Sequence, residues 1–164
     1  RLVLTDNKRH WFVRPEHGIK PAATRIHGLT DDDVIGSPDI ADIADDIITW
    51  IEDTPIAGHN VKIEVDILKR SIPDWRPKSA IDTLKLAKIL RPGLPSYGLA
   101  NLGVEFGLAN EAANRTGAKH HSALYDATLT ALLMIHLLSP LTPDERRKAV
   151  EEANIFDPRQ GSLL

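Results

Sequence analysis

The sequence contains no cysteine among its 164 residues, which excludes a disulfide framework and a thiolate metal site. It also lacks any run of about 18 apolar residues, the length that a membrane-spanning helix needs. Positive charge is not in excess, because 23 acidic residues outnumber 20 basic ones and the formal net charge is −3. This balance excludes the basic field that grips long duplex nucleic acid, but not an enzyme that holds a short strand end through metal ions. From these absences we expect a cytoplasmic protein.

The composition is that of an ordinary globular protein, with 42% hydrophobic and 26% charged residues. The length suffices for one domain with a substantial core. The chain begins with Arg1 rather than Met and opens directly on a strand-like run. We therefore expect a fragment from which an N-terminal segment has been removed.

Apolar periodicity and turn-forming residues predict short strands that alternate with helices. A β-hairpin is expected first, with strands at 2–4 and 11–13 and a turn at 6–8. The consecutive acids at 31–33 are expected to cap a short helix rather than bind a metal, because consecutive helical residues point in different directions. Further strands are expected at 55–58 and 79–81, and helices at 21–27, 30–35, 40–51, 60–70, 82–90, 96–106, 123–138 and from 142 onward.

Three segments are expected to contribute little to the core. The stretch 107–119 is rich in small and polar residues and is predicted to be a mobile loop, and the tail 156–161 shows no regular pattern. The helix from 142 onward is rich in Arg and Glu and is expected to be solvated. The order of the remaining elements predicts an α/β domain with a mixed sheet.

The segment 119–138 carries the strongest chemical signal. Apolar residues occupy nearly every side of its helix, which predicts that the helix is buried all round. Asp126 on such a helix needs a metal ion, a cation or a dense set of donors, because an isolated buried charge is very costly. His121 precedes the helix, which Ser122 can cap, and is placed to act as a general base beside a metal. The alternative is a structural histidine and an aspartate held by neighbouring hydroxyls.

A second polar constellation lies at 58–68. Apolar residues and Asn60 flank Glu64 at helical spacing, so Glu64 is expected to point toward the protein. Basic residues flank Asp66 in the same way, which predicts a surface ion pair. Glu64 follows a strand-to-helix turn, where a parallel sheet commonly places its active site. Asn60 can cap that helix, and a lone histidine such as His59 is more often a structural hydrogen-bonding group than a ligand.

These segments belong to an ordered set of motifs: Gly58-His59-Asn60 with Glu64, then Ile81-Asp82-Thr83, then 96–102, then His121 to Asp126. The set resembles the DEDDh family of 3'-5' exonucleases. The segments 13–15 and 26–30 are similar to earlier landmarks of that family. Each motif is weak alone, but their order is specific, and the resemblance extends to about Leu138.

The resemblance implies a ribonuclease H-like fold, a mixed sheet flanked by helices, with its N-terminal strand missing from this chain. It implies an exonuclease domain at 1–139, followed by a C-terminal helix and tail at 140–164. The implied activity is metal-dependent hydrolysis of phosphodiester bonds at 3' ends of single-stranded DNA, with release of mononucleotides, as in proofreading or repair. The implied partners are a single-stranded 3' end and a DNA polymerase or another replication or repair protein.

The family's chemistry also implies roles for individual residues. Two Mg²⁺ or Mn²⁺ ions are held by acids, of which Asp126 and Glu64 occupy two positions. His121 occupies the position of the general base, and His59 and Asn60 those of substrate-binding residues.

Two departures from the family pattern matter. Glu64 stands where the family usually has Asp, and the longer side chain can shift an ion or its water. The first motif, an Asp-x-Glu strand, is absent, and Asp6 lies in the expected hairpin turn and cannot replace it. We therefore expect an incomplete metal site that lacks two carboxylates. An exoribonuclease of the same family and a catalytically silent binding or scaffold module remain as alternatives.

Overall fold

The structure is a computed structural model that describes residues 2–118 and 121–156. Its elements are α1 (Pro21–His27), α2 (Asp31–Val34), the 3-10 helix η1 (Ile40–Ile43), α3 (Ala44–Ile51), β1 (Ile56–Gly58), α4 (Lys62–Ser71), β2 (Ala80–Asp82), α5 (Thr83–Leu90), α6 (Leu99–Glu105), α7 (Ala109–Thr116), α8 (Ala123–Leu138) and α9 (Pro143–Ala153). The helices predicted from the sequence, and both strands after residue 55, are confirmed within three residues of their expected ends.

The sheet of the described residues is small and consists of two strands. β1 and β2 pair in parallel, with Ala57 opposite Ile81. Asn154 then forms an isolated antiparallel bridge with Ile81, and the Ile155 N–H donates to the Ala80 carbonyl at 2.9 Å. The predicted α/β class, with helices flanking a sheet, is therefore confirmed. The two described strands are parallel, and the antiparallel direction appears only as the bridge at Asn154.

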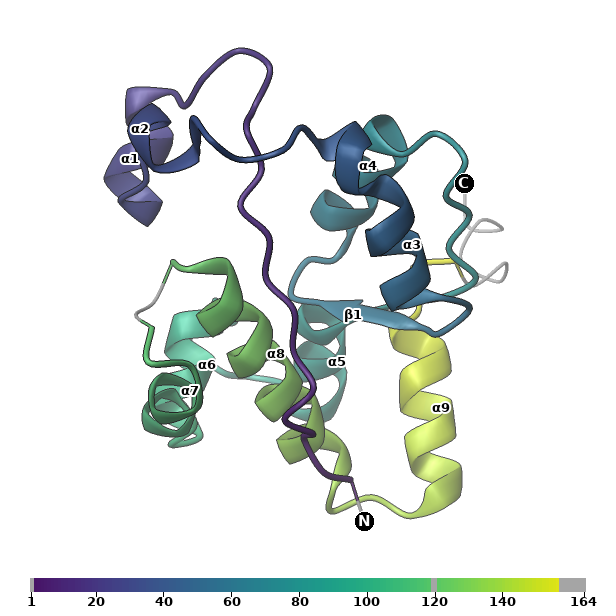
Figure 1. Cartoon of the computed structure of the whole chain (residues 1–164). Coiled ribbons are helices and arrows are strands. Elements are labelled where there is room, and N and C mark those ends of the chain that lie inside the picture. Colours follow the sequence, from purple (N-terminus) through teal and green to yellow (C-terminus); the bar gives the residue numbers. More distant parts are fainter. Residues whose placement is uncertain (1, 119–120, 157–164) are drawn as a thin grey trace.

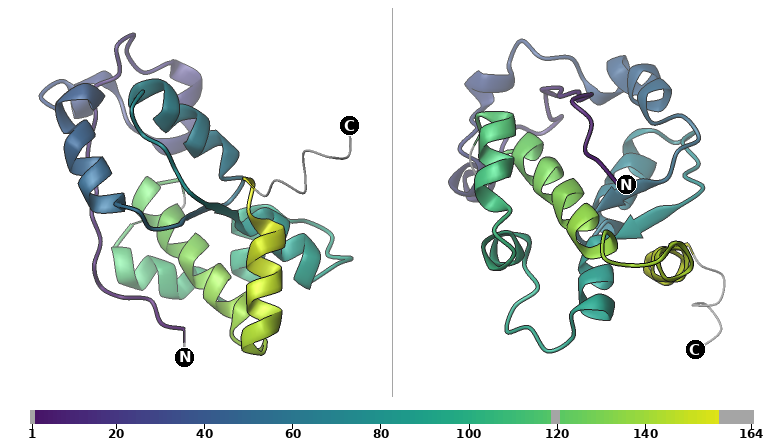
Figure 2. Two further views of the ribbon diagram at one scale, coloured as in Figure 1. Left: turned by 90° about the vertical axis from the view of Figure 1, so that its right-hand side faces the viewer. Right: turned by 90° about the horizontal axis from the view of Figure 1, so that it is seen from below.

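Helices cover both faces of this sheet. Figure 1 shows α3 and α4 above it and α5, α8 and α9 below it, and Figure 2 gives the view from below. The upper core contains Ile43, Ile47, Val61, Val65, Ile72, Trp75 and Ala80. The lower core contains Ile81, Leu86, Ala87, Leu102, Leu133, Leu137, Leu138, Ala149 and Ala153. No helix of the described residues is both long enough and apolar enough to span a bilayer.

The last helix contributes to this lower core. Its Arg and Glu side chains are largely solvated, as expected, but Ala149 and Ala153 are buried against α5 and β2. The expectation of a solvated helix is therefore only half right, because small residues on one side allow close packing. The tail expected at 156–161 lies outside the described residues from residue 157 onward.

The predicted N-terminal hairpin is wrong. Residues 2–20 contain no strand, and Figure 1 shows this segment rising past α8 and β1 toward α1 and α2. Leu4 packs against a small core between α7 and α8, whereas Trp11 and Val13 pack against the upper core. An isolated two-stranded hairpin is marginal in water, so the apolar residues of this segment gain more by contacting the helices separately.

The predicted loop at 107–119 is also wrong over most of its length, because it contains α7. Ala112 on this helix is fully buried against α8. Gly117 ends the helix in the left-handed conformation, with φ of 64°, and its N–H donates to the Ala113 carbonyl. A run of small residues is typical of a loop, but here these residues allow α7 and α8 to approach each other closely. Residues 119–120 lie outside the described part of the chain.

Candidate functional site

The buried carboxylate of Asp82 forms hydrogen bonds with both turns that follow β1 and β2. Asp82 Oδ1 accepts hydrogen bonds from the backbone N–H of Asn60 and from that of Leu84, both at 2.9 Å. The second of these bonds caps the start of α5. The sequence suggested that Asp82 begins a helix, but not that it also fixes the β1–α4 turn, which lies 22 residues earlier.

His59 lies in this turn with both ring nitrogens bonded to protein groups. Nε2 lies 2.8 Å from the Tyr97 carbonyl oxygen and Nδ1 lies 3.0 Å from Thr83 Oγ1. A carbonyl only accepts, so Nε2 carries the proton of the neutral ring. The Thr83 hydroxyl lies within hydrogen-bond distance of both Nδ1 and the Gly58 carbonyl oxygen, to which it donates at 3.2 Å. Burial lowers the pKa of His59, and the Tyr97 carbonyl and Asp82 only partly oppose this. These contacts agree with the structural role that the sequence left open for this residue.

This environment predicts how acid affects stability. The pKa of His59 is lower in the folded protein than its ordinary value of 6.5, so the unfolded chain binds more protons. The contribution of His59 to the free energy of unfolding is therefore at its full value above about pH 6.5. It decreases as the pH falls through 6.5 toward the lower pKa that His59 has in the folded protein. Urea denaturation between about pH 5 and about pH 8 should show this loss. His59→Gln should flatten the dependence, whereas His17→Gln, at an exposed position, should leave it unchanged; equal profiles for His59→Gln and the unsubstituted protein would contradict the assignment.

Asn60 does not cap α4 as expected. Its φ is +66°, in the left-handed region that Asn tolerates better than most residues. The N-cap position belongs to Val61, and no side-chain capping bond is present there. The turn is tight as well, because a Cβ at Gly58 would lie 2.8 Å from Val61 Cγ2. Asn60 therefore contributes to the turn through its backbone, and its side chain is exposed.

Glu64 is exposed, so the expectation that it points into the protein is wrong. The buried face of α4 is formed by Val61 and Val65, and Glu64 lies at the edge of that face. Partial desolvation raises the pKa of Glu64, and the negative charge of Asp82 raises it further. The carboxylate of Glu64 thus lies on the side of α4 that adjoins the strand ends.

Asp66 has the predicted surface position. Its carboxylate accepts a hydrogen bond from Lys62 Nζ at 2.7 Å, and Arg70 Nε donates to its backbone carbonyl at 3.1 Å. The bond to Lys62 is the main cause that lowers the pKa of Asp66. The predicted ion pair is confirmed.

His121 and Asp126 line one pocket of about 430 Å³. Its other lining residues come from the N-terminal segment, α1, α2 and the start of α8: His10, Trp11, Phe12, Val13, Pro15, Ile19, His27, Leu29, Val34, Ser122 and Ala123. His121 is exposed and has a φ of +70°. Ser122 Oγ accepts from the Tyr125 N–H at 3.3 Å and caps α8 as predicted.

α8 is not buried all round at this end. Asp126 is half-buried, and Ala123 and Ala127 are exposed. The buried side of the helix carries Tyr125 and Leu129 instead. Apolar residues on all sides suggested complete burial, but alanines at the first turns are small enough to stay in contact with water at little cost.

The structure therefore places the predicted residues in two groups. His121 and Asp126 share a pocket, whereas Glu64 is not among its lining residues and belongs with Asp82 at the strand ends. α8 packs against β1, so the groups lie on neighbouring elements. Within residues 2–118 and 121–156, no three His, Cys, Asp or Glu side chains form a cluster that could hold a metal ion. The described side chains do not build a metal centre by themselves.

Comparisons with known proteins match the part of the chain that carries the motifs. A family model described as an exonuclease matches residues 2–134. The chain is 29% identical over 143 residues to DNA polymerase III subunit epsilon of Aquifex aeolicus, covering 85% of this chain and 67% of that protein. It is 33% identical over 143 residues to the epsilon subunit of Rickettsia felis, covering 82% and 60%.

A longer polymerase and a solved exonuclease structure are also similar to this chain. The PolC-type DNA polymerase III of Oceanobacillus iheyensis is 29% identical over 147 residues, which is 87% of this chain but 10% of that protein. A solved structure of exonuclease X in complex with 5' overhanging duplex DNA has a TM-score of 0.64 and 30% identity, covering 84% of this chain and 78% of that one. The chain thus spans a tenth of the PolC-type polymerase and between 60% and 67% of the two epsilon subunits.

Proposed function

Because the chain belongs to the exonuclease family whose model matches residues 2–134, we propose that it is a metal-dependent 3'-5' exonuclease acting on single-stranded DNA. It hydrolyses phosphodiester bonds at 3' ends and releases mononucleotides. The assignment to the DEDDh exonucleases is confirmed by the family match, the epsilon relatives and the exonuclease X neighbour. The observation that carries the proposal is that this match runs through every motif of the ordered set.

His121 is the proposed general base. It is exposed on the entry turn of α8 and shares its pocket with Asp126. An imidazole there can accept the proton of a water molecule that attacks phosphorus. The left-handed backbone at His121 supports this role, because strained backbone tends to occur at functional sites.

Asp126 and Glu64 are the proposed metal ligands. Members of this family use divalent metals, and carboxylate oxygens are the ligands that Mg²⁺ and Mn²⁺ prefer. We propose Mg²⁺ or Mn²⁺ in a two-ion site, which supplies Lewis-acid stabilisation of charge at the phosphate when bound. Two carboxylates on separate helices do not complete such a site, so these residues are proposed as part of its ligands only.

His59 and Asn60 are proposed to serve substrate binding in different ways. His59 acts as a positioning residue, since its ring is bonded to Thr83 and Tyr97. Asn60 is exposed at the strand ends and can reach a substrate directly.

A pair of substitutions at Asn60 separates its backbone role from its side-chain role. Asn60→Gly should keep or slightly raise thermal stability, because glycine adopts a positive φ without strain. Asn60→Ala should lower stability by about 1 kcal/mol, the cost of the left-handed conformation for an ordinary residue. If the side chain contacts substrate, both variants should raise KM for a single strand. A normal KM for Asn60→Gly would confine Asn60 to the turn.

The wider assignments follow from the relatives. We propose an exonuclease domain at 1–139 with a C-terminal helix and tail at 140–164. A DNA polymerase is the proposed partner and the cytoplasm the proposed location, because the similar proteins are bacterial DNA polymerase III subunits.

Digestion of a 5'-labelled single-stranded DNA tests the function. When the remaining metal ligands are supplied, we expect a ladder of products shortened from the 3' end, with mononucleotide release that depends on Mg²⁺ or Mn²⁺ and stops on chelation. Asp126 and Glu64 alone should support negligible digestion. A matched RNA strand that is degraded faster would favour the exoribonuclease alternative. Tight binding without hydrolysis at any metal concentration would favour the silent module, which draws support from the lack of a three-donor cluster in the described part of the chain.

A further inference from the structure

Charge is unevenly distributed along this chain. Residues 31–53 contain nine Asp or Glu and no Lys or Arg, whereas residues 62–91 contain eight Lys or Arg and four Asp or Glu. The second segment includes α4 and α5, the helices that follow β1 and β2. One of its four acids, Asp82, is buried. The molecule therefore has a locally basic region at these two helices despite its negative net charge.

The exposed side of α4 combines this charge with apolar surface. Ile63 is 54% exposed and Ile67 is 47% exposed, and residues four apart lie on the same side of a helix. The buried side of α4 is already formed by Val61 and Val65, so these two isoleucines do not contribute to the core.

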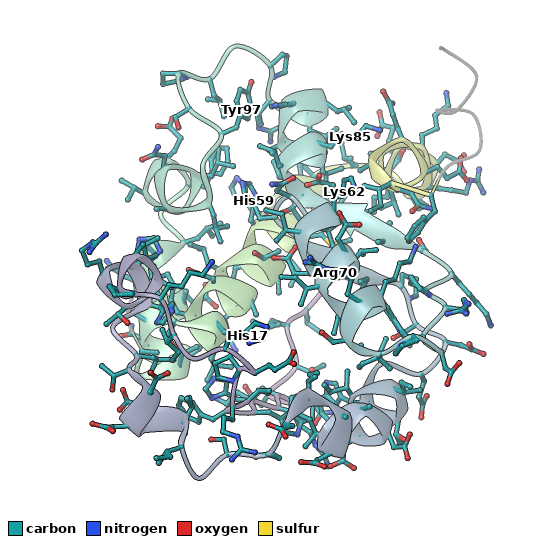
Figure 3. The ribbon with its side chains drawn as sticks, turned by 90° about the horizontal axis from the view of Figure 1, so that it is seen from above. His17, His59, Lys62, Arg70, Lys85 and Tyr97 are labelled. Atoms are coloured by element: carbon teal, nitrogen blue, oxygen red, sulfur yellow. The ribbon has the colours of Figure 1, made fainter. Side chains whose placement is uncertain are left out.

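Neighbouring side chains complete this surface. At helical spacing, Ile67 lies between Glu64 and Arg70, which are each three residues away from it. Lys62 and Arg70 are both exposed, and Figure 3, which looks onto α4, shows them on this helix with Lys85 on α5. The order around α4 is thus a candidate ligand acid, then an apolar strip, then a column of Lys62 and Arg70 with Asp66 between them. We call Lys62, Ile63, Ile67 and Arg70 the α4 surface.

We propose that the α4 surface binds single-stranded nucleic acid on its way to the candidate active site. Lys62 and Arg70 contact phosphates, and Ile63 and Ile67 contact the faces of unstacked bases. Single strands are bound by this combination of a cationic path for the backbone and apolar platforms for the bases. The inference rests on the proposed nuclease function, and it adds a site for nucleotides upstream of the scissile bond.

Charge argues for nucleic acid over another occupant. Lys62 already has Asp66 as a counter-charge at 2.7 Å, whereas Arg70 Nε donates to the backbone carbonyl of Asp66. A purely apolar partner would therefore desolvate the Arg70 guanidinium at high cost. Phosphates spaced along a strand supply a counter-charge for Arg70 and compete with Asp66 for Lys62. Glu64, at the edge of the same surface, is repelled by phosphate unless a cation lies between them, which fits its proposed place as a metal ligand.

A double substitution with a matched control tests the cationic part. Lys62→Gln with Arg70→Gln removes two charges from α4 and breaks the ion pair of Lys62 with Asp66, 2.7 Å long. Arg147→Gln with Lys148→Gln removes two charges from α9 and breaks the ion pair of Arg147 with Asp144, 2.8 Å long. The two double variants therefore match in charge and in ion pairs lost, but lie on opposite faces of the sheet.

Fluorescence anisotropy with a labelled DNA strand of about 12 nucleotides, in chelator to prevent hydrolysis, provides the readout. The α4 double variant should bind about tenfold more weakly at low salt, and the slope of log K against log salt should fall by about 1.4, or about 0.7 for each lost phosphate contact. The α9 double variant should match the unsubstituted protein in both quantities.

The apolar part has its own signature. Ile63→Ala with Ile67→Ala should weaken binding without changing the salt slope, because no phosphate contact is lost. Ile35→Ala with Val104→Ala removes similar side chains, 71% and 75% exposed, from the C-terminal end of α2 and from α6, and should have no effect.

Failure of this inference can be distinguished from failure of the proposed function. Equal affinity and salt slope for the two charge variants, with normal hydrolysis by both, would overturn the α4 surface and leave the nuclease proposal intact. Weaker binding by the α4 variant, with no hydrolysis by any variant even when the remaining metal ligands are supplied, would support the surface and contradict the nuclease.

Discussion

Replacing His121 by alanine is expected to lower kcat by about 10²–10⁴-fold, the range for loss of a general base. The residue is exposed on the entry turn of α8 and shares a pocket with Asp126, so its removal should leave the core and the affinity for divalent metal unchanged. Steady-state hydrolysis of a single strand measures the loss, and metal titration with the same variant shows whether binding persists.

One comparison identifies the base. His120→Ala is the adjacent control and should cost far less activity than His121→Ala. If His120→Ala proves the more damaging substitution, the role belongs to the other histidine.

Removing the Glu64 carboxylate is expected to reduce activity by about 100-fold or more, since even outer-shell partners of a metal cost 10–100-fold. Asp66→Ala on the same helix should have little effect, because that carboxylate is held by Lys62 on the solvated side. The raised pKa of Glu64 adds a pH signature: below its pKa a carboxylate is protonated and loses metal, so activity should decline at less acidic pH than for an ordinary glutamate.

Glu64→Asp restores the residue type that the family usually has at this position. It should keep or raise activity, which separates a ligand from a merely acidic surface residue. Mild and equal losses for Glu64→Ala and Asp66→Ala would contradict the assignment and would agree with the exposed position of Glu64.

Local signals in the sequence predicted most elements of the fold. Capping boxes at Thr30 and Thr142 mark the starts of α2 and α9, and such boxes involve residues only three apart. The N-terminal hairpin and the loop at 107–119 were mispredicted for a different reason. Whether these segments form a strand, a coil or a helix depends on what packs against them, and a single sequence does not show that.

The candidate site divides in the same way. The pairing of His121 with Asp126 was predictable, because the two residues are close in sequence and flank one helix start. The bond from His59 to the Tyr97 carbonyl spans 38 residues, and the bond from Asn60 to Asp82 spans 22. Contacts of that range depend on how β1 and β2 pair. The exposure of Glu64 was missed because helical spacing defines a face but not how much of that face its neighbours cover.

The shared carboxylate of Asp82 has a consequence for local opening. The amide protons of Asn60 and Leu84 bond to the same oxygen. Neither proton exchanges with solvent until its hydrogen bond to the Asp82 carboxylate breaks. Amide hydrogen exchange at these two positions should therefore be correlated, with similar protection. An insertion in either turn would loosen the other, so the β1–α4 and β2–α5 turns cannot accumulate length changes independently during evolution.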